Sequence, residues 1–100
     1  MKTLNEIKKI ILEHKKELRE KYKVKTIGIF GSYARGEQKE TSDIDILVEF
    51  EEGYKNFDNF MNLYYYLKDI FKTDVDLLTK ESISKHLRNE ILSEVEYIEG

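Results

Sequence analysis

The chain has 100 residues, of which 40% are hydrophobic and 37% are charged, and its formal net charge is −3. This length suffices for one hydrophobic core, so we expect a single domain over residues 1–100, and the hydrophobic fraction excludes a disordered chain. The 17 Lys and Arg residues alternate with 20 Asp and Glu residues, which excludes a basic surface for direct nucleic-acid binding.

The chain contains no cysteine. Disulfides, thiolate catalysis and zinc–thiolate sites are therefore excluded. The longest uncharged run is too short for a membrane span, and the N-terminal residues MKTLNEIKK lack the apolar stretch of a signal peptide. We expect a cytoplasmic protein that does not contact a membrane.

The first predicted element is a helix from Leu4 to Tyr22. Thr3 and Glu6 have the spacing of a capping box at its N-terminus. One face carries apolar side chains at helical spacing, namely Leu4, Ile7, Ile10, Ile11, Leu18 and Tyr22.

Two strands are predicted next, at Val24–Phe30 and Asp43–Phe50. Gly31 and Ser32 end the first strand, and a short helical turn and a polar loop follow. The second strand alternates, so its two faces differ. Ile44, Ile46, Val48 and Phe50 lie on one face, and Asp43, Asp45, Leu47 and Glu49 lie on the other.

The second half of the chain adds two helices and a third strand. Asp58 is the predicted N-cap of the next helix, whose buried stripe comprises Phe57, Phe60, Met61, Tyr64, Leu67, Ile70 and Phe71. A short strand is expected from Thr73 to Leu78. A helix over Lys80–Glu94 follows, with Ile83, Leu87, Ile91 and Leu92 facing inward, and Val95–Ile98 is extended. This order predicts an α+β fold with helices packed on a small mixed sheet.

Gly31 and Ser32 form the first part of a possible chemical site. A glycine directly after a strand allows a sharp turn and a close approach of the backbone to a ligand. The backbone amides of such a turn, with the Ser32 hydroxyl, suit phosphate oxygens. A simple turn is the alternative reading of this pair taken alone.

Asp43 and Asp45 form the second part. They are two residues apart on a strand, so both carboxylates emerge from one face, about 7 Å apart at the backbone. Two like charges this close repel each other, and a divalent cation removes that repulsion. Oxygen ligands with open positions suit magnesium. Asp76 on the third strand is the natural third ligand, and Asp74 is the alternative.

Each of these residues also has a simpler explanation. An isolated D-x-D on an amphipathic strand is usually a solvated polar face. Ser42 is either part of the nucleotide site or a cap for its loop. Arg35 either steadies a triphosphate or pairs with a nearby carboxylate such as Glu37. The combination of the glycine turn, the acidic pair and the later acidic strand favours a site for a metal ion and phosphate over these simpler explanations.

The segment Gly31–Gly36, followed by Ser42–Asp45, resembles the G-S-x(10)-D-x-D signature of the DNA polymerase beta-like nucleotidyltransferase superfamily. Within it, the chain resembles the minimal nucleotidyltransferases, which have about this length. The resemblance implies that Gly31 and Ser32 bind the triphosphate of ATP. It also implies that Asp43, Asp45 and Asp76 hold two magnesium ions.

The resemblance also implies a partner. Minimal nucleotidyltransferases pair with HEPN proteins as toxin–antitoxin systems, in which the nucleotidyltransferase transfers AMP from ATP to a tyrosine of the HEPN ribonuclease. We therefore expect an adenylyltransferase antitoxin that assembles with a HEPN toxin in a hetero-oligomer, or with itself in a homo-oligomer. A non-catalytic module that neutralises the HEPN partner by occlusion is the alternative hypothesis. Modification of a small molecule is a third possibility and would need an additional acceptor domain.

Overall fold

The computed structural model describes residues 2–98. Its helices are α1 (Leu4–Glu13), α2 (Lys15–Glu20), α3 (Gly31–Arg35), α4 (Phe57–Phe71) and α5 (Lys85–Glu94). Its strands are β1 (Val24–Phe30), β2 (Ile44–Phe50), β3 (Val75–Thr79) and β4 (Glu96–Tyr97), and a 3-10 turn at Lys80–Ser82 precedes α5. The predicted α+β class is confirmed.

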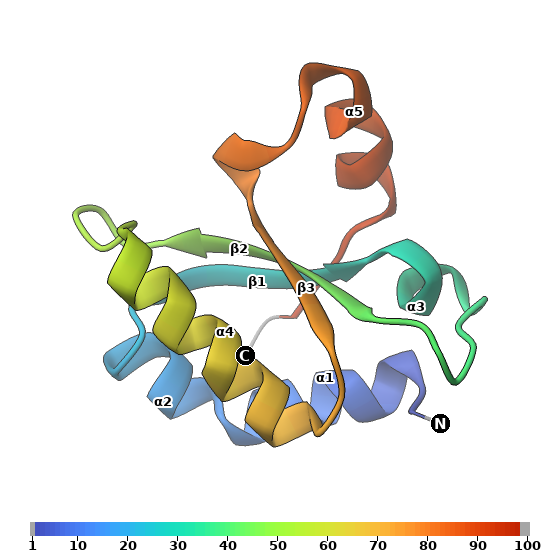
Figure 1. The fold of residues 1–100 in the computed structure, drawn as a ribbon, viewed down its shortest axis with the longest axis horizontal. Helices are drawn as coiled ribbons and strands as arrows, with labels where there is room; N and C mark the ends of the chain where they lie inside the picture. Colours follow the sequence, from blue (N-terminus) through green and yellow to red (C-terminus); the bar gives the residue numbers. More distant parts are fainter. Residues whose placement is uncertain (1, 99–100) are drawn as a thin grey trace.

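The strands form one mixed sheet in the order β3-β2-β1-β4 (Figure 1). β1 pairs antiparallel with both β2 and β4, whereas β2 pairs in parallel with β3. The parallel pair is possible because α4 connects the two strands across one face of the sheet. The end of β1 therefore lies beside the beginnings of β2 and β3.

The main hydrophobic core lies between the sheet and the layer formed by α1, α2 and α4 (Figure 1). The buried side chains of this helical layer are Ile7, Ile11, Leu18, Leu63, Leu67 and Phe71. The capping box of α1 is present, because the Thr3 hydroxyl accepts from the Glu6 N–H while the Glu6 carboxylate accepts from the Thr3 N–H.

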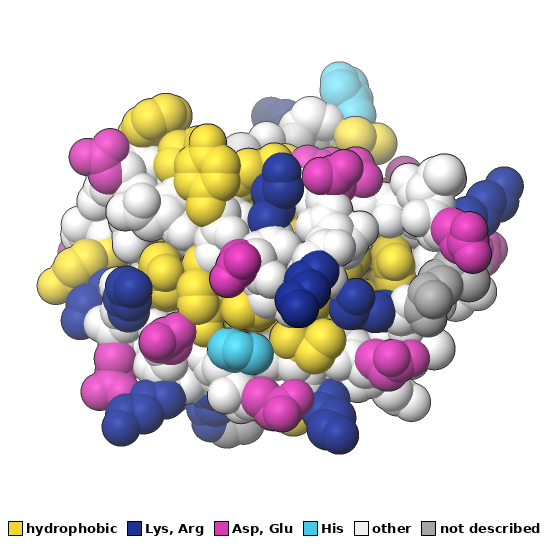
Figure 2. Space-filling model, turned by 60° about the horizontal axis from the view of Figure 1, so that its bottom comes forward, with side chains coloured by type: hydrophobic (Ala, Val, Ile, Leu, Met, Phe, Trp, Pro, Cys, Tyr) yellow, Lys and Arg dark blue, Asp and Glu magenta, His cyan; other side chains and the backbone are white. Residues whose placement is uncertain are grey.

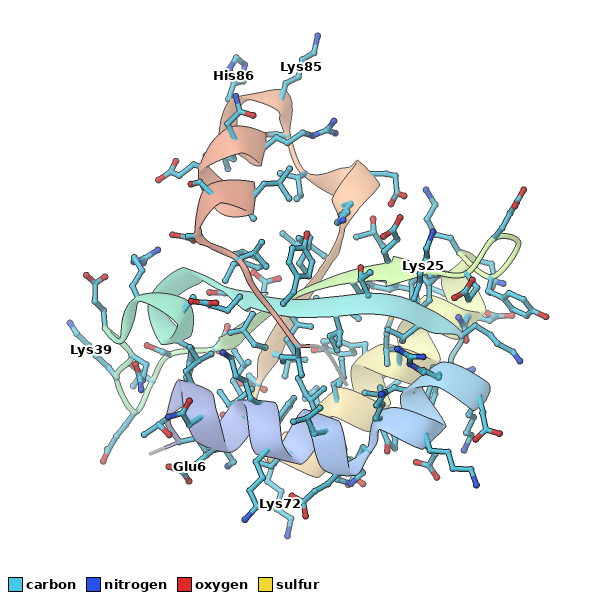
Figure 3. The ribbon with its side chains drawn as sticks, turned by 180° about the vertical axis from the view of Figure 1, so that it is seen from behind. Glu6, Lys25, Lys39, Lys72, Lys85 and His86 are labelled. Atoms are coloured by element: carbon cyan, nitrogen blue, oxygen red, sulfur yellow. The ribbon has the colours of Figure 1, made fainter. Side chains whose placement is uncertain are left out.

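The opposite face of the sheet has a much smaller core. Its buried members are Phe30, Leu47 and Ile83, and α5 contributes only partly buried side chains. The helix α5 rises from this face, and Lys85 and His86 at its beginning point away from the sheet (Figure 3). Along β2, every second side chain, including Asp45 and Leu47, lies on this second face.

The predicted helix from Leu4 to Tyr22 is interrupted at His14. The imidazole Nδ1 atom of His14 lies 2.7 Å from the carbonyl oxygen of Ile10. The backbone N–H of His14 donates instead to the carbonyl oxygen of Ile11. The imidazole therefore replaces the regular backbone partner of Ile10, and the chain bends between α1 and α2. The second helix ends at Glu20, although Tyr22 beyond it is buried.

The predicted start of α4 is also wrong. The N-cap is Asn56, whose side chain accepts from the Asn59 N–H at 2.9 Å, and Asp58 lies inside the first turn. Phe57 is 76% exposed instead of buried. The helix begins two residues earlier than a cap at Asp58 would give, and Phe57 is its exposed first residue. Leu63 takes a buried position that the predicted stripe omitted.

The last predicted helix is shorter and less buried than expected. A 3-10 turn and an extended Ile83 precede α5, which begins at Lys85. Leu87 and Leu92 are 51% and 40% exposed, because Ile91 and Val95 are the side chains that pack against the small core. The third strand begins at Val75 and extends to Thr79, shifted from the expected range.

The outer face of the helical layer carries both signs of charge. Figure 2 shows Lys and Arg side chains interspersed with Asp and Glu side chains and with apolar atoms. No large region of one sign is visible on this face. Within residues 2–98, every helix is too short or too polar to cross a membrane.

Candidate active site

The turn after β1 is shaped by Gly31. Phe30 is extended, and Gly31 has φ +72°, in the left-handed region that favours glycine. A Cβ atom at Gly31 would collide with the carboxylate of Asp45, whose Cγ atom would lie only 2.9 Å from that Cβ. Glycine therefore permits both the turn and the direct approach of the backbone to Asp45.

The sheet brings Asp45 and Asp76 together. Asp45 pairs with Phe30 across the antiparallel β1–β2 ladder and with Asp76 across the parallel β2–β3 ladder. The two aspartates are therefore neighbours, on the face of the sheet that also carries Leu47 and α5. Asp43 is exposed and directly precedes β2. The acidic residues gather where β2 and β3 begin, beside the glycine turn.

The electrostatics of Asp45 reflect this crowding. Burial, and then the negative charges of Asp76 and Asp43, raise the pKa of Asp45 from 3.8 to about 6. Arg35 opposes this rise, and Glu94 adds to it. Asp45 thus lies in an environment where a cation would be strongly favoured.

Ser32, Ser42 and Arg35 have different surroundings. Ser32 is half-buried in α3 next to Gly31. The Ser42 hydroxyl accepts a hydrogen bond from the Lys39 N–H at 2.9 Å, which is the loop-capping arrangement. The Nε atom of Arg35 pairs with Glu37 at 2.8 Å, which confirms the predicted pairing with a nearby carboxylate.

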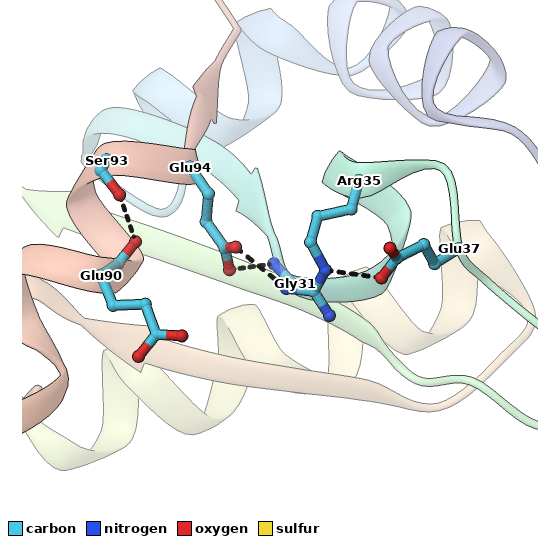
Figure 4. Close-up of polar contacts among 6 residues, drawn as sticks. All are labelled: Gly31, Arg35, Glu37, Glu90, Ser93 and Glu94. Atoms are coloured by element: carbon cyan, nitrogen blue, oxygen red, sulfur yellow. Dashed lines mark hydrogen bonds and ion pairs between the residues drawn. The ribbon is translucent and has the colours of Figure 1, made fainter.

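Sequence reasoning missed Glu94, the last residue of α5. Its carboxylate accepts from the Gly31 N–H at 2.9 Å and pairs with Arg35 at 2.9 Å (Figure 4). Glu94 follows Gly31 by 63 positions and belongs to no recognisable motif. Only the packing of α5 over the second face of the sheet places it at this turn.

The acidic residues fit magnesium in their chemistry. Among residues 2–98, no three Asp, Glu or His side chains are already arranged to hold a metal ion. However, Asp45 and Asp76 are adjacent, and Asp43 lies near enough to raise the pKa of Asp45. Asp43 and Asp76 are exposed, so their side chains can rotate toward a cation. These hard oxygen donors match the preference of magnesium.

Known proteins resemble this chain in sequence and in fold. Residues 11–98 match the family described as the nucleotidyltransferase domain. The protein adenylyltransferase MntA of Thermococcus cleftensis is 48% identical over 98% of both chains.

Two solved structures are similar as well. The chain superimposes on a minimal nucleotidyltransferase with a TM-score of 0.76 and 28% identity, covering 95% of each chain. It also matches a chain of a toxin–antitoxin complex with AMP-PNP, with a TM-score of 0.71 and 28% identity over 93% of this chain and 73% of that one.

The glycine turn and the paired aspartates lie on a mixed sheet whose fold matches that of a minimal nucleotidyltransferase. The family match covers most of the chain and includes each of these elements. The chain therefore belongs to the nucleotidyltransferase family.

Proposed function

We propose that the chain, acting as one domain over residues 1–100, is a cytoplasmic antitoxin that transfers AMP from ATP to a tyrosine hydroxyl of a cognate HEPN ribonuclease toxin. The observation that carries this proposal is the pairing of Asp45 with Asp76 directly beside the Gly31 turn. The relationship to the protein adenylyltransferase MntA supports a protein acceptor, and the likeness to a toxin–antitoxin complex with AMP-PNP supports ATP as the nucleotide.

Each residue of the site has a role in this proposal. The Gly31 amide and the Ser32 hydroxyl bind the triphosphate, and Arg35 and Ser42 border it. Asp43, Asp45 and Asp76 would hold two magnesium ions. These ions would stabilise the charge on the triphosphate and lower the pKa of the attacking hydroxyl. We assign Asp43 and Asp45 to both ions and Asp76 chiefly to the ion beside the hydroxyl.

The transfer balances as a single displacement. The tyrosine oxygen forms a bond to the α-phosphorus, and the bond between the α-phosphorus and the bridging oxygen to the β-phosphate breaks. Pyrophosphate leaves, and the hydroxyl proton passes to solvent. The acceptor then carries a phosphodiester, whose negative charge would repel the RNA phosphate at a ribonuclease site. This repulsion explains how the modification would silence the toxin.

The test is intact-mass spectrometry of the HEPN partner after incubation with this chain, ATP and magnesium, with RNA cleavage followed in parallel. We expect the mass to increase by one AMP unit per modified hydroxyl while cleavage falls. Asp43→Asn should prevent both changes because it removes a proposed metal ligand. Asp58→Asn is the matched control, since Asp58 is an exposed aspartate on α4, and it should retain full transfer.

The same experiment tests the alternative of occlusion. If RNA cleavage falls without any mass increase, and Asp43→Asn inhibits the partner equally well, the chain acts as a binding module and the transferase proposal is wrong. If Asp76→Asn retains full transfer, the third ligand is misassigned, and Asp74 is the next residue to test.

A further inference from the structure

The carboxylate of Glu94 is held by two donors from the segment that follows β1. Its Oε1 atom accepts from the Gly31 N–H, and its Oε2 atom pairs with Nη1 of Arg35, both at 2.9 Å (Figure 4). The Glu94 side chain is only 21% exposed. We call the Gly31 N–H and the Arg35 guanidinium the anion seat.

The anion seat has the chemistry of a phosphate site. A backbone N–H and a guanidinium are donors that proteins commonly direct at phosphate oxygens, and a carboxylate offers them similar acceptors. The seat also lies directly against Asp45, because the backbone of Gly31 abuts that carboxylate. A phosphate that binds to the Gly31 N–H must take the place of the Glu94 carboxylate.

Two features of its surroundings disfavour a negative charge on Glu94. It is the last residue of α5, where the helix dipole is negative and acidic side chains are disfavoured. Its charge also contributes to the raised pKa of Asp45. The contacts with Gly31 and Arg35 are therefore the interactions that hold this carboxylate in place.

Side-chain packing holds α5 only weakly, although β4, which begins two residues after Glu94, pairs with β1. No side chain of α5 is buried, and Ile91 and Val95 pack only partly against the small core of Phe30, Leu47 and Ile83. Rotation of the Glu94 side chain away from Gly31 would expose little apolar surface, because the surrounding side chains of α5 are not buried. The fold permits Glu94 to leave the seat without disturbing the main core.

We propose that Glu94 is an internal competitor of the nucleotide, whose carboxylate occupies the anion seat until a phosphate group of ATP displaces it. This inference rests on the proposed function, because it assumes the nucleotide site described there. It adds that the Glu94 carboxylate lowers the affinity of that site for ATP. Glu94 acts on binding alone and takes no part in the chemical step.

The test is calorimetric titration of the protein with AMP-PNP and magnesium. Glu94→Gln keeps the size of the side chain and removes its charge, so it weakens the hold on Arg35. Glu94→Asp keeps the charge but shortens the side chain by one methylene, so the carboxylate withdraws from the Gly31 N–H. We expect both variants to bind AMP-PNP more tightly, by roughly threefold to tenfold, as expected for the loss of a partly exposed ion pair and hydrogen bond.

Glu90→Gln is the matched control. Glu90 lies one turn earlier on α5, and its carboxylate contacts neither Gly31 nor Arg35 (Figure 4). This variant removes the same charge from the same helix and should leave the affinity unchanged. If Glu94→Gln tightens binding but Glu94→Asp does not, the effect is one of charge alone and the competitor proposal is wrong. Unchanged or weaker binding in both Glu94 variants also overturns it.

The inference and the proposed function can fail separately. Transfer of AMP to the HEPN partner with unchanged AMP-PNP affinity in the Glu94 variants would overturn only the inference. Tighter AMP-PNP binding in both Glu94 variants without any transfer to the partner would overturn only the proposed reaction. A complete absence of AMP-PNP binding in the wild type and in every variant would overturn both.

Discussion

The two faces of the sheet differ in what they bury. The face under α1, α2 and α4 carries a continuous apolar core, whereas the face under α5 buries only Phe30, Leu47 and Ile83. All the candidate acidic ligands cluster on this second, thinly covered side. One face therefore supplies stability, and the other is left open for charged groups that destabilise the fold.

Strand β2 shows the division within seven residues. Ile44, Ile46 and Val48 are completely buried on the main core side, while Asp45 alternates with them and has a raised pKa. An acidic site that repels itself requires stability from elsewhere, because natural domains have only a small margin of stability. The helical layer supplies that margin here.

The largest expected effect is the loss of a core side chain from the helical layer. Phe71 is fully buried, so Phe71→Ala should lower the free energy of unfolding by about 3 to 5 kcal/mol. Ile83→Ala, on the α5 face, should cost about 2 kcal/mol, since its surroundings can collapse around the gap. Urea denaturation of both variants measures the difference. Equal losses would show that the two faces contribute equally to stability.

A substitution at Gly31 should affect the site more than the fold. Gly31→Ala should cost about 2 kcal/mol and abolish AMP transfer, because a Cβ there collides with Asp45 in a left-handed turn. Gly36 shares the φ of +72° but has open space around it, so Gly36→Ala should cost about 1 kcal/mol and preserve transfer. Thermal unfolding and the mass assay test the pair. Retention of transfer in Gly31→Ala would contradict the assigned role of this turn.

Replacing Asp45 with the uncharged Asn should stabilise the fold and abolish AMP transfer. The pKa of Asp45 is about 6 in the folded protein and 3.8 normally, so the folded state binds more protons between these values. Wild-type stability should therefore fall as the pH rises from about 4 to about 6. After allowance for solvent screening, Asp45→Asn should be on the order of 1 kcal/mol more stable at pH 7 and equal at pH 4.

Denaturation at a series of pH values checks this prediction. The diagnostic quantity is the difference between wild type and Asp45→Asn, because other carboxylates contribute to both pH profiles. A difference that stays constant from pH 4 to pH 7 would show that the Asp45 carboxyl has an ordinary pKa.

The smallest expected effect concerns the helix caps on the two faces. The Asn56 side chain caps α4, so Asn56→Ala should cost about 1 kcal/mol. Ser84 precedes α5 without a capping hydrogen bond from its side chain, so Ser84→Ala should change stability very little. Both variants should retain AMP transfer. Comparison of their unfolding midpoints tests whether the helical layer is the better-ordered half of the fold.

The amino-acid sequence alone determined the features that depend on local periodicity. The alternation along β2 places Asp45 opposite the main core, and the capping box at Thr3 starts α1 where expected. The turn at Gly31 follows from the glycine at the end of a β-rich segment. These features were predictable because each depends on residues that are close together in the chain.

Only the tertiary structure decided which distant groups meet. Asp45 and Asp76 are neighbours because β2 pairs in parallel with β3. Glu94 contacts Gly31 because α5 packs back over the sheet. The exposure of Leu87 has the same cause, since a helical pattern identifies an apolar face but not whether another element covers it. Periodicity describes one element at a time, whereas the site depends on the order of the strands in the sheet.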